Sequence, residues 1–350
     1  MAMGIREIPK DEYAELYKAS EFSFLQSPEW AELKKDDGYS PRFFAYEGGA
    51  ILALSKSYPV LGTQAYIPRP LFVSASGGDK PGDKIDEQLK AAIPAFATEM
   101  KKLFGVVLVD MDLPPALLAN EEAARNWASR TEAAFSSAGF KAGKTIQPVK
   151  TAIVDLTCSE EEWLSLVRKS ARERIKAGVN AGASGKISIK RIDPKEEPDE
   201  LNTIIEKIVM LSEEKFNSRK TGYLNRMVEL FGEKAVIWSV RAGDRCEGGS
   251  IGILDENQKI YHTIYSAIAR EVLREHNAGY LLKLYQWRLG HELGYKWMDM
   301  WGVETDPNHP WYGFSQFKLG FGAKIVEYPK QFRLFRSPLF KVAFSLSHSA

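Results

Sequence analysis

The sequence predicts an α/β (α+β) protein with mixed sheets, in which one series of elements occurs twice. Alternating apolar residues flank Gly48–Gly49 and, in the second half, Gly243, which is typical of β-hairpins. After each hairpin come a further strand, a helix and a short apolar strand, with a similar spacing in both halves. A Rossmann or barrel fold would require strict alternation of strand and helix, so this order favours a duplicated fold with mixed sheets.

The first half contains a clear helix start. Ser27 and Pro28 combine an N-cap serine with proline at the first helical position, and the helix should end near Gly38. Pro68 and Pro70 interrupt a later apolar run and restrict it to a sheet edge or an extended loop. The other elements expected in this half are strands over 42–46, 50–56 and 106–111 and helices over 86–102 and 121–137.

The second half repeats this order and ends in an aromatic tail. Its expected elements are strands over 236–241, 249–254, 259–265 and 297–301 and helices over 200–216 and 277–293. The tail, residues 331–344, mixes aromatic residues with Lys and Arg. Such a segment can lie on a bilayer surface as an amphipathic element, but we favour ordinary core packing against the first half.

A cationic helix is expected between the halves, after a strand over 151–156. Ser159 and Glu162 match a capping box, and the helix that they open has one apolar side. Its other side carries the cations Arg168, Lys169, Arg172 and Lys176. One interpretation is a solvated helix face, and the other is a ridge that contacts the phosphates of RNA or of a nucleotide-linked substrate.

Composition argues against several classes of protein. The 350 residues carry a net charge of +1, so binding to nucleic acid or to an anionic membrane would need a local patch. Cys158 and Cys246 are far apart and the five histidines lack ligand spacing, which argues against a disulfide framework and a metal site. With neither a signal-like segment nor an apolar run of membrane-spanning length, we expect a cytoplasmic protein. We also expect it to be a monomer.

The segment 294–322 contains the clearest candidate for chemistry. A short apolar strand is followed by a polar turn and by the sequence Phe317-Lys-Leu-Gly-Phe-Gly. Lys318 is the only Lys or Arg from residue 305 to residue 322, which makes it a candidate to bind an anion or an oxyanion. The alternative is a lysine on an edge strand whose stem lies on Phe317 or Phe321.

Strong catalytic motifs, such as a Walker loop or a nucleophile elbow, are absent from the sequence, and we expect no cofactor. Polar residues instead gather near the expected strand ends and after the helix over 200–216: Asp110, Asp112, Arg219, Tyr223, Tyr261, Tyr265, Asp299 and Lys318. Such a set suits an acyl transfer from an activated ester to an amine, because positioning and charge stabilisation then supply most of the rate.

Six segments form a recognisable series: Phe24–Lys34, Gln147–Leu156, Arg172–Lys176, Gly279–Leu282, Asp299–Gly302 and Phe317–Gly322. In this order they resemble the Fem family, the aminoacyl-tRNA-dependent peptidyltransferases that build peptidoglycan cross-bridges. The resemblance implies two GNAT-like domains in tandem. The first would comprise residues 1–150 with 325–350, and the second residues 151–324.

The resemblance also implies a reaction and its partners. An amino acid moves from aminoacyl-tRNA to a side-chain amine on the stem peptide of a UDP-linked or lipid-linked muropeptide precursor. The cationic helix face is then the candidate tRNA contact. A peripheral contact with the inner membrane surface would accompany a lipid-linked acceptor.

Roles for individual residues follow from the matching motifs. Lys34 and Arg219 would hold the phosphates of the precursor, and Tyr223 would help to position it. Tyr265 and Asp112 would line the acceptor site, with Asp112 near the attacking amine. Phe317 and Lys318 would lie at the reaction centre, with Lys318 facing the oxyanion or the tRNA end. The alignment leaves three alternatives open: Lys35 for Lys34, Tyr261 for Tyr265 and Asp110 for Asp112.

The sequence departs from the family at one turn, and two other functions compete. The family usually has a glycine after its Tyr-Ile-Pro segment, whereas Tyr66–Pro70 has none. One alternative is an acyl-CoA-dependent GNAT-type enzyme acting on a polysaccharide or small amine, although the turn at Arg274–Gly279 matches a CoA-binding turn poorly. The other is a non-catalytic protein that binds a cell-wall precursor.

Overall fold

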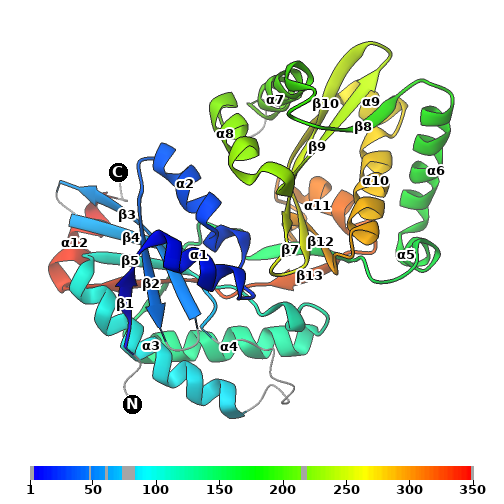
Figure 1. Ribbon diagram of the computed structural model, residues 1–350. Helices are drawn as coiled ribbons and strands as arrows, with labels where there is room; N and C mark the ends of the chain where they lie inside the picture. The colour runs from blue at the N-terminus through cyan, green and yellow to red at the C-terminus, as the bar shows by residue number, and fades with distance from the viewer. Residues whose placement is uncertain (1–3, 47–48, 60–61, 73–82, 214–218, 348–350) are drawn as a thin grey trace. The chain divides into compact units, whose positions relative to one another are not determined.

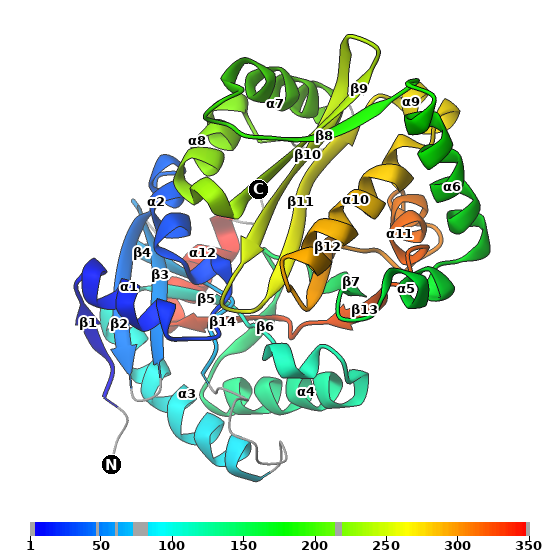
Figure 2. The ribbon, with the colours of Figure 1, turned by 45° about the vertical axis from the view of Figure 1, so that its right-hand side comes forward.

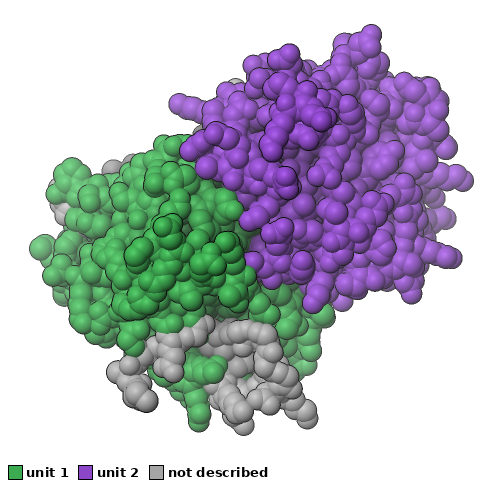
Figure 3. All heavy atoms as spheres, viewed as in Figure 1, with its two compact units in different colours: residues 1–149, 326–350 green, residues 150–325 purple. Residues whose placement is uncertain are grey.

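The computed structural model describes residues 4–46, 49–59, 62–72, 83–213 and 219–347. The chain divides into two compact units, which Figure 3 colours separately. Unit 1 comprises residues 1–149 and 326–350, and unit 2 comprises residues 150–325. Each unit is built on one seven-stranded mixed sheet with helices on both faces (Figure 1).

In unit 1 the β4–β5 pair is parallel and every other pair is antiparallel. The sheet order is β1 (Arg6–Ile8), β2 (Ser40–Tyr46), β3 (Gly49–Tyr58), β4 (Gly62–Pro68), β5 (Val106–Asp110), β14 (Gln331–Phe335) and β6 (Lys141–Gly143). The helices are α1 (Lys10–Lys18), α2 (Pro28–Asp36), α3 (Asp83–Leu103), α4 (Glu121–Ser137) and α12 (Pro338–Ser347). Helices α3 and α4 cover one face of the sheet, and α1 and α2 cover the other (Figures 1 and 2).

In unit 2 the β11–β12 pair is the parallel counterpart of β4–β5. The sheet order is β8 (Ser188–Ile192), β9 (Ala235–Ala242), β10 (Arg245–Asp255), β11 (Ile260–Ile268), β12 (Trp297–Gly302), β7 (Lys150–Asp155) and β13 (Lys324–Glu327). The helices are α5 (Glu160–Leu166), α6 (Lys169–Ala183), α7 (Pro198–Glu213), α8 (Thr221–Phe231), α9 (Arg270–Glu275), α10 (Ala278–Glu292) and α11 (Tyr312–Leu319).

Aromatic residues dominate both cores. In unit 1 the ring of Phe135 on α4 stacks on Phe332 of β14, with centroids 4.3 Å apart. In unit 2 Trp163 of α5 stacks on Trp287 of α10 at 4.7 Å. Buried rings of this size contribute more apolar area than any other side chains, so these contacts fix the helices against their sheets.

Strands β7 and β14 each lie in a different sheet from the strand that precedes them in the chain. Strand β6 lies at the edge of the first sheet, but the next strand, β7, lies beside β12 in the second sheet. Strand β13 lies at the edge of the second sheet, and the next strand, β14, is inserted between β5 and β6 of the first. Both sheets therefore have the same order of equivalent strands, and the predicted duplicated α/β fold with mixed sheets is confirmed.

Several local predictions are confirmed. The Ser27 hydroxyl accepts a hydrogen bond from the Trp30 N–H at 3.0 Å and caps α2. Ser159 and Glu162 form the predicted capping box at the start of α5. Both hairpins form, as β2–β3 and β9–β10, and the helix expected over 121–137 is α4. The first part of the tail is β14, which packs into the core of unit 1.

Three local predictions are wrong. Strand β4 is an inner strand, because Pro68 occupies its last position, where a missing N–H interrupts no further ladder bonds. The single helix expected after Ser159 is two helices, since Val167 and Arg168 adopt extended conformations with ψ of 134° and 141°. Lys318 lies on helix α11 rather than on an edge strand.

The turn that lacks the expected glycine keeps a glycine-like conformation. Arg69 follows β4 with a φ of 43°, in the left-handed region. Its guanidinium lies 3.8 Å from the centroid of the Tyr328 ring and donates a hydrogen bond to the Pro148 carbonyl at 3.1 Å. These contacts offset the strain that a non-glycine residue meets in this region.

Candidate functional site

The sheet of unit 2 opens at the end of β12. Parallel pairing between β11 and β12 reaches only His262 and Asp299, although β11 continues to Ile268. On the other side of β12, the pairing with β7 is irregular between Asp299 and Gly302. Here Trp301 has a φ of 63°, a left-handed conformation that costs a non-glycine residue about 1–3 kcal/mol. Such strain is often found at functional sites.

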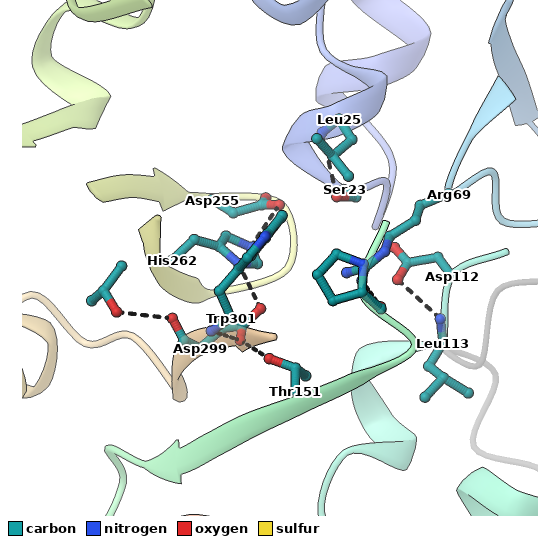
Figure 4. A network of polar contacts seen from close by, with 12 residues as sticks. Ser23, Leu25, Arg69, Asp112, Leu113, Thr151, Asp255, His262, Asp299 and Trp301 are labelled. Carbon is teal, nitrogen blue, oxygen red and sulfur yellow. Dashed lines mark hydrogen bonds and ion pairs between the residues drawn. The ribbon is translucent and has the colours of Figure 1, made fainter. Parts of the chain in front are cut away.

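The carboxylate of Asp299 holds this strained turn. Its Oδ1 accepts hydrogen bonds from the Trp301 N–H at 2.7 Å and from the Thr151 hydroxyl (Figure 4). Its Oδ2 lies 3.0 Å from Nδ1 of His262. The side chains of Asp299, Thr151 and His262 are all buried, so these polar contacts are shielded from water.

His262 joins Asp299 to a second buried carboxylate. The Nε2 atom of His262 lies 3.7 Å from Oδ2 of Asp255, at the end of β10 (Figure 4). Burial lowers the pKa of His262, but its hydrogen bonds and charge interactions with Asp255 and Asp299 raise that pKa more, so the net direction is upward. The cationic imidazole would thus be stabilised between two carboxylates.

Lys318 is buried above the same turn. From α11, its Nζ donates hydrogen bonds to the carbonyls of Gly302 at 2.7 Å and Trp301 at 3.3 Å. It also lies 4.6 Å from the centroid of the Phe314 ring. Burial lowers the pKa of Lys318 to about 8, and the charge of Asp299 opposes this shift. An ammonium has three N–H groups, so one remains without an acceptor among the described residues.

A second buried lysine lies in the same network and was missed from the sequence. Nζ of Lys283 on α10 donates hydrogen bonds to Gln286 Oε1 at 2.8 Å and to the Thr263 hydroxyl at 3.1 Å. Burial, followed by the charge of Lys318, lowers the pKa of Lys283 to about 7. The available signal was a Lys in the middle of a helix whose other residues are mostly apolar.

The segment around Phe317 is packed tightly onto its neighbours. The half-buried Phe317 ring makes edge contacts with Tyr280 at 5.0 Å and Phe321 at 5.1 Å between centroids. Gly322 has a φ of 71°, and a Cβ there would lie 3.2 Å from the backbone carbon of Leu166. The glycine is therefore required by both conformation and space. The structure thus packs Phe317 against Tyr280 and Phe321, while Lys318 reaches the turn held by Asp299.

The acceptor-site residues predicted in unit 1 are buried and partnered. Lys34 is 5% exposed, and its Nζ forms an ion pair with Asp37 at 2.7 Å while lying 4.5 Å from the Trp30 ring centroid. Asp112 is 2% exposed, and its Oδ1 accepts the Leu113 N–H at 3.0 Å. A phosphate would have to compete with Asp37 for Lys34.

The remaining residues predicted for the acceptor site lie in unit 2. The exposed guanidinium of Arg219 lies 4.7 Å from the ring centroid of Tyr223, at the start of α8. Tyr265 is half-buried on β11, and its carbonyl accepts the Ser250 hydroxyl at 3.0 Å. The alternative residue, Tyr261, is fully buried and accepts a hydrogen bond from Trp238, so Tyr265 is the more accessible of the two.

The cationic residues of α6 divide into two kinds. Arg168 donates a hydrogen bond to Gln316 Oε1 at 2.9 Å, and this glutamine lies two residues before Lys318. Arg172 donates to the carbonyls of Leu164 and Ser165 at 3.1 Å and so caps the end of α5. Lys169 and Lys176 are exposed. Arg168 therefore links the cationic face to the helix that carries Lys318.

Within the described ranges, no group of three or more His, Cys, Asp or Glu side chains has the arrangement of a metal site. Among the same residues, no helix is both long and apolar enough to cross a membrane.

The tandem arrangement of two similar mixed sheets is a fold that the chain shares with solved structures. No family model matches the chain, and no curated protein matches it. A solved structure of FemX matches with a TM-score of 0.77 and 17% identity over 97% of this chain and 99% of the other. The resemblance to the Fem family is thus confirmed at the level of the fold.

Two further solved structures share this fold over nearly their full length. One is the C-terminal domain of a putative lysylphosphatidylglycerol synthetase from Agrobacterium fabrum, with a TM-score of 0.55, 13% identity and coverage of 97% of both chains. The other is L-PGS from Bacillus licheniformis, with a TM-score of 0.51, 14% identity and coverage of 92% of this chain and 96% of that one. At these identities the likeness establishes the fold alone.

Proposed function

We propose that the chain is an aminoacyltransferase that moves an amino acid from aminoacyl-tRNA to an amine of a peptidoglycan-precursor stem peptide. The observation that carries this proposal is the agreement with FemX, which extends over nearly all of both chains. The motifs quoted above that resemble the Fem family include Phe317–Gly322, and the structure holds Lys318 of that motif in a buried polar network.

The reaction requires stabilisation of one negative charge. The amine nitrogen forms a bond to the ester carbonyl carbon, and the bond from that carbon to the tRNA ribose oxygen then breaks. The carbonyl oxygen is negative in the tetrahedral intermediate, and one proton passes from the amine to the leaving ribose oxygen. The third N–H of Lys318 would donate to that oxyanion in a site of low water content, where charge stabilisation is strongest.

The surrounding residues would position this ammonium. Asp299 holds Trp301, and the carbonyls of Trp301 and Gly302 hold Nζ of Lys318. Phe317 would pack beside the donor ester. Arg168, Lys169, Arg172 and Lys176 would meet the phosphates of the tRNA, with Arg168 nearest to α11.

The acceptor would be held by the residues that the family resemblance assigns. Lys34 and Arg219 would bind the phosphates of a UDP-linked or lipid-linked precursor, with Tyr223 and Tyr265 beside it. Asp112 would lie near the attacking amine. We further propose that the enzyme acts as a monomer in the cytoplasm.

The test is a transfer assay read by mass spectrometry. A set of charged tRNAs is combined with the UDP-linked muropeptide, the lipid-linked muropeptide, and buffer alone. We expect the muropeptide mass to rise by one amino-acid residue, and we expect ribonuclease to abolish this product. Transfer that survives ribonuclease would exclude a tRNA donor, and a product formed from acetyl-CoA would favour the acyl-CoA alternative.

A second candidate acceptor is a phospholipid. Two of the similar solved structures are a domain of a putative lysylphosphatidylglycerol synthetase and L-PGS, with TM-scores of 0.55 and 0.51. The FemX score of 0.77 favours the muropeptide. Adding phosphatidylglycerol to the same assay separates the two, because aminoacyl-phosphatidylglycerol and extended muropeptide differ in mass.

A further inference from the structure

Helix α12 of unit 1 presents apolar side chains in two directions. One side packs inward: Phe344 is 4% exposed and makes an edge contact with Phe335 of β14, with centroids 5.7 Å apart. The other side carries Leu339, Val342 and Leu346, which are 76%, 57% and 71% exposed. The spacing of these three residues places them in one stripe along the helix. The three exposed side chains of this stripe do not pack in the core of unit 1, so core packing does not explain why they are apolar.

The surroundings of this stripe are cationic. From residue 328 onward the sequence contains Lys330, Arg333, Arg336 and Lys341 and not one Asp or Glu. Arg336 precedes the helix and Lys341 lies within it, and both side chains are exposed. Strand β6, which pairs with β14, adds Lys141, and Lys144 follows that strand. The whole chain carries only +1, so this concentration of positive charge is local.

We propose that α12 is a contact site for an anionic phospholipid surface. Leu339, Val342 and Leu346 would enter the boundary between headgroups and acyl chains, while Arg336 and Lys341 would contact the lipid phosphates. A short apolar stripe flanked by cations has the chemistry of a helix that lies in a membrane interface. An interface between two copies of the chain would bring the same cations together, and their repulsion makes that occupant less favourable. This contact does not depend on the proposed aminoacyl transfer.

Such a contact would be weak and reversible. One helix with three apolar side chains supplies little buried area, and the cations add attraction that salt screens. We therefore expect the chain to sediment with vesicles of phosphatidylglycerol and phosphatidylcholine at low salt. Binding should decrease as the salt concentration rises, and vesicles of phosphatidylcholine alone should bind much less.

Two variants of the full chain test the two parts of the surface. Leu339→Ser/Val342→Ser/Leu346→Ser should lower the vesicle partition coefficient about tenfold. Arg336→Gln/Lys341→Gln should lower it about 25-fold, because each of the two cations near an anionic surface contributes roughly fivefold. The matched control is Met210→Ser/Leu293→Ser, which replaces exposed apolar residues of unit 2 and should bind as the unmodified chain does.

Several outcomes would overturn the proposal. These are equal binding to both kinds of vesicle, unchanged binding by both α12 variants, or competition by inorganic phosphate, which would indicate a simple anion site. Loss of self-association in the serine variant, measured by sedimentation velocity, would assign the stripe to a second copy. Capture by an acidic protein without vesicle binding would assign it to a protein partner. If circular dichroism shows that the serine variant is unfolded, the vesicle binding of the charge variant alone tests the proposal.

Discussion

Asp110 and Asp299 occupy the same place in the two units. Asp110 is the last residue of β5 and is in parallel register with Pro68, and Asp299 on β12 is in parallel register with His262. Both carboxylates are buried. Each also accepts a hydrogen bond from a side chain of the neighbouring exchanged strand, which is Gln331 on β14 or Thr151 on β7.

The partners of the two carboxylates differ in charge. Asp110 accepts hydrogen bonds from neutral groups, the Tyr66 hydroxyl at 2.8 Å and the Gln147 N–H at 3.1 Å. Burial raises the pKa of Asp110, and these bonds and the charge of Arg69 only partly oppose that rise. Asp299 instead contacts His262, and its charge acts on Lys283 and Lys318.

The same position at the end of the parallel strand pair therefore has a different chemical role in each unit. In unit 1 it joins β5 to its neighbours through neutral hydrogen bonds. In unit 2 the same position gathers His262, whose pKa is raised by its carboxylate neighbours, and two lysines around one carboxylate, in a part of the sheet where the ladder has opened. Perturbed ionisable groups of this kind are found more often at functional sites than elsewhere.

The largest expected effect concerns Lys318, whose buried ammonium binds the turn that Asp299 holds. Lys318→Ala should lower the rate of the proposed transfer by about 10²- to 10³-fold, the scale of losing one oxyanion donor. Single-turnover measurement of the transfer checks this. Lys102→Ala removes an exposed lysine of α3 and serves as the control. A near-normal rate for Lys318→Ala would remove this lysine from the mechanism.

The second prediction compares the two carboxylates directly. Asp299→Asn should lower the free energy of unfolding by about 3 kcal/mol, because it leaves His262 with one carboxylate instead of two. Asp110→Asn should cost about 1 kcal/mol, since a neutral amide can keep most of the bonds to neutral partners. Urea unfolding measures both. Equal losses would show that the two surroundings do not differ in energy.

The third prediction concerns pH and Lys283. Its folded-state pKa of about 7 lies below its ordinary value of 10.5, so the unfolded chain binds more protons between these values. This lysine should therefore make the free energy of unfolding rise with pH from about 7 to about 10, by up to about 1.4 kcal/mol per unit. Lys283→Met should lack this contribution.

The measurement for Lys283 is urea unfolding of both proteins across the same pH range. His262 acts in the opposite direction, because its pKa is raised: its contribution is complete below pH 6.5 and is lost as pH rises through the folded-state pKa. Subtracting the Lys283→Met curve removes this and other shared titrations. A flat difference between the curves would mean that Lys283 is not perturbed by burial.

The smallest effects concern the side chains on the exchanged strands. Thr151→Val removes a hydroxyl that donates to the Asp299 carboxylate and should cost about 1.5 kcal/mol of unfolding free energy. Gln331→Leu removes a longer hydrogen bond to Asp110, at 3.3 Å, and should cost about 0.5 kcal/mol. Urea unfolding tests both variants: the midpoint should fall while the dependence of the unfolding free energy on urea concentration stays the same. A larger loss for Gln331→Leu would reverse the contrast between the units.

Local signals in the sequence predicted the elements well, because short-range chemistry determines them. The hydroxyls of Ser27 and Ser159 cap helices by accepting a hydrogen bond from the backbone three residues later, so this signal is local in the sequence. Gly243 likewise allows a hairpin turn. The break at Val167 and Arg168 was missed, since neither residue is a helix breaker. It follows from a tertiary contact, the hydrogen bond from the Arg168 N–H to the Gly320 carbonyl.

The candidate site was predicted only in part. Lys318 stood out because it is the only Lys or Arg from residue 305 to residue 322. The network around it was not visible, because Asp255, His262 and Asp299 come from three strands. Only the sheet register brings His262 opposite Asp299, and no spacing along the chain encodes it.

The exchange of β7 and β14 has a consequence for biosynthesis. The first sheet needs β14 between β5 and β6, yet nearly all of unit 2 is translated before that strand. During translation the N-terminal sheet therefore has exposed edges on β5 and β6, which are open to mispairing until the last strand arrives. A chaperone that binds the nascent chain would have its greatest effect in this interval.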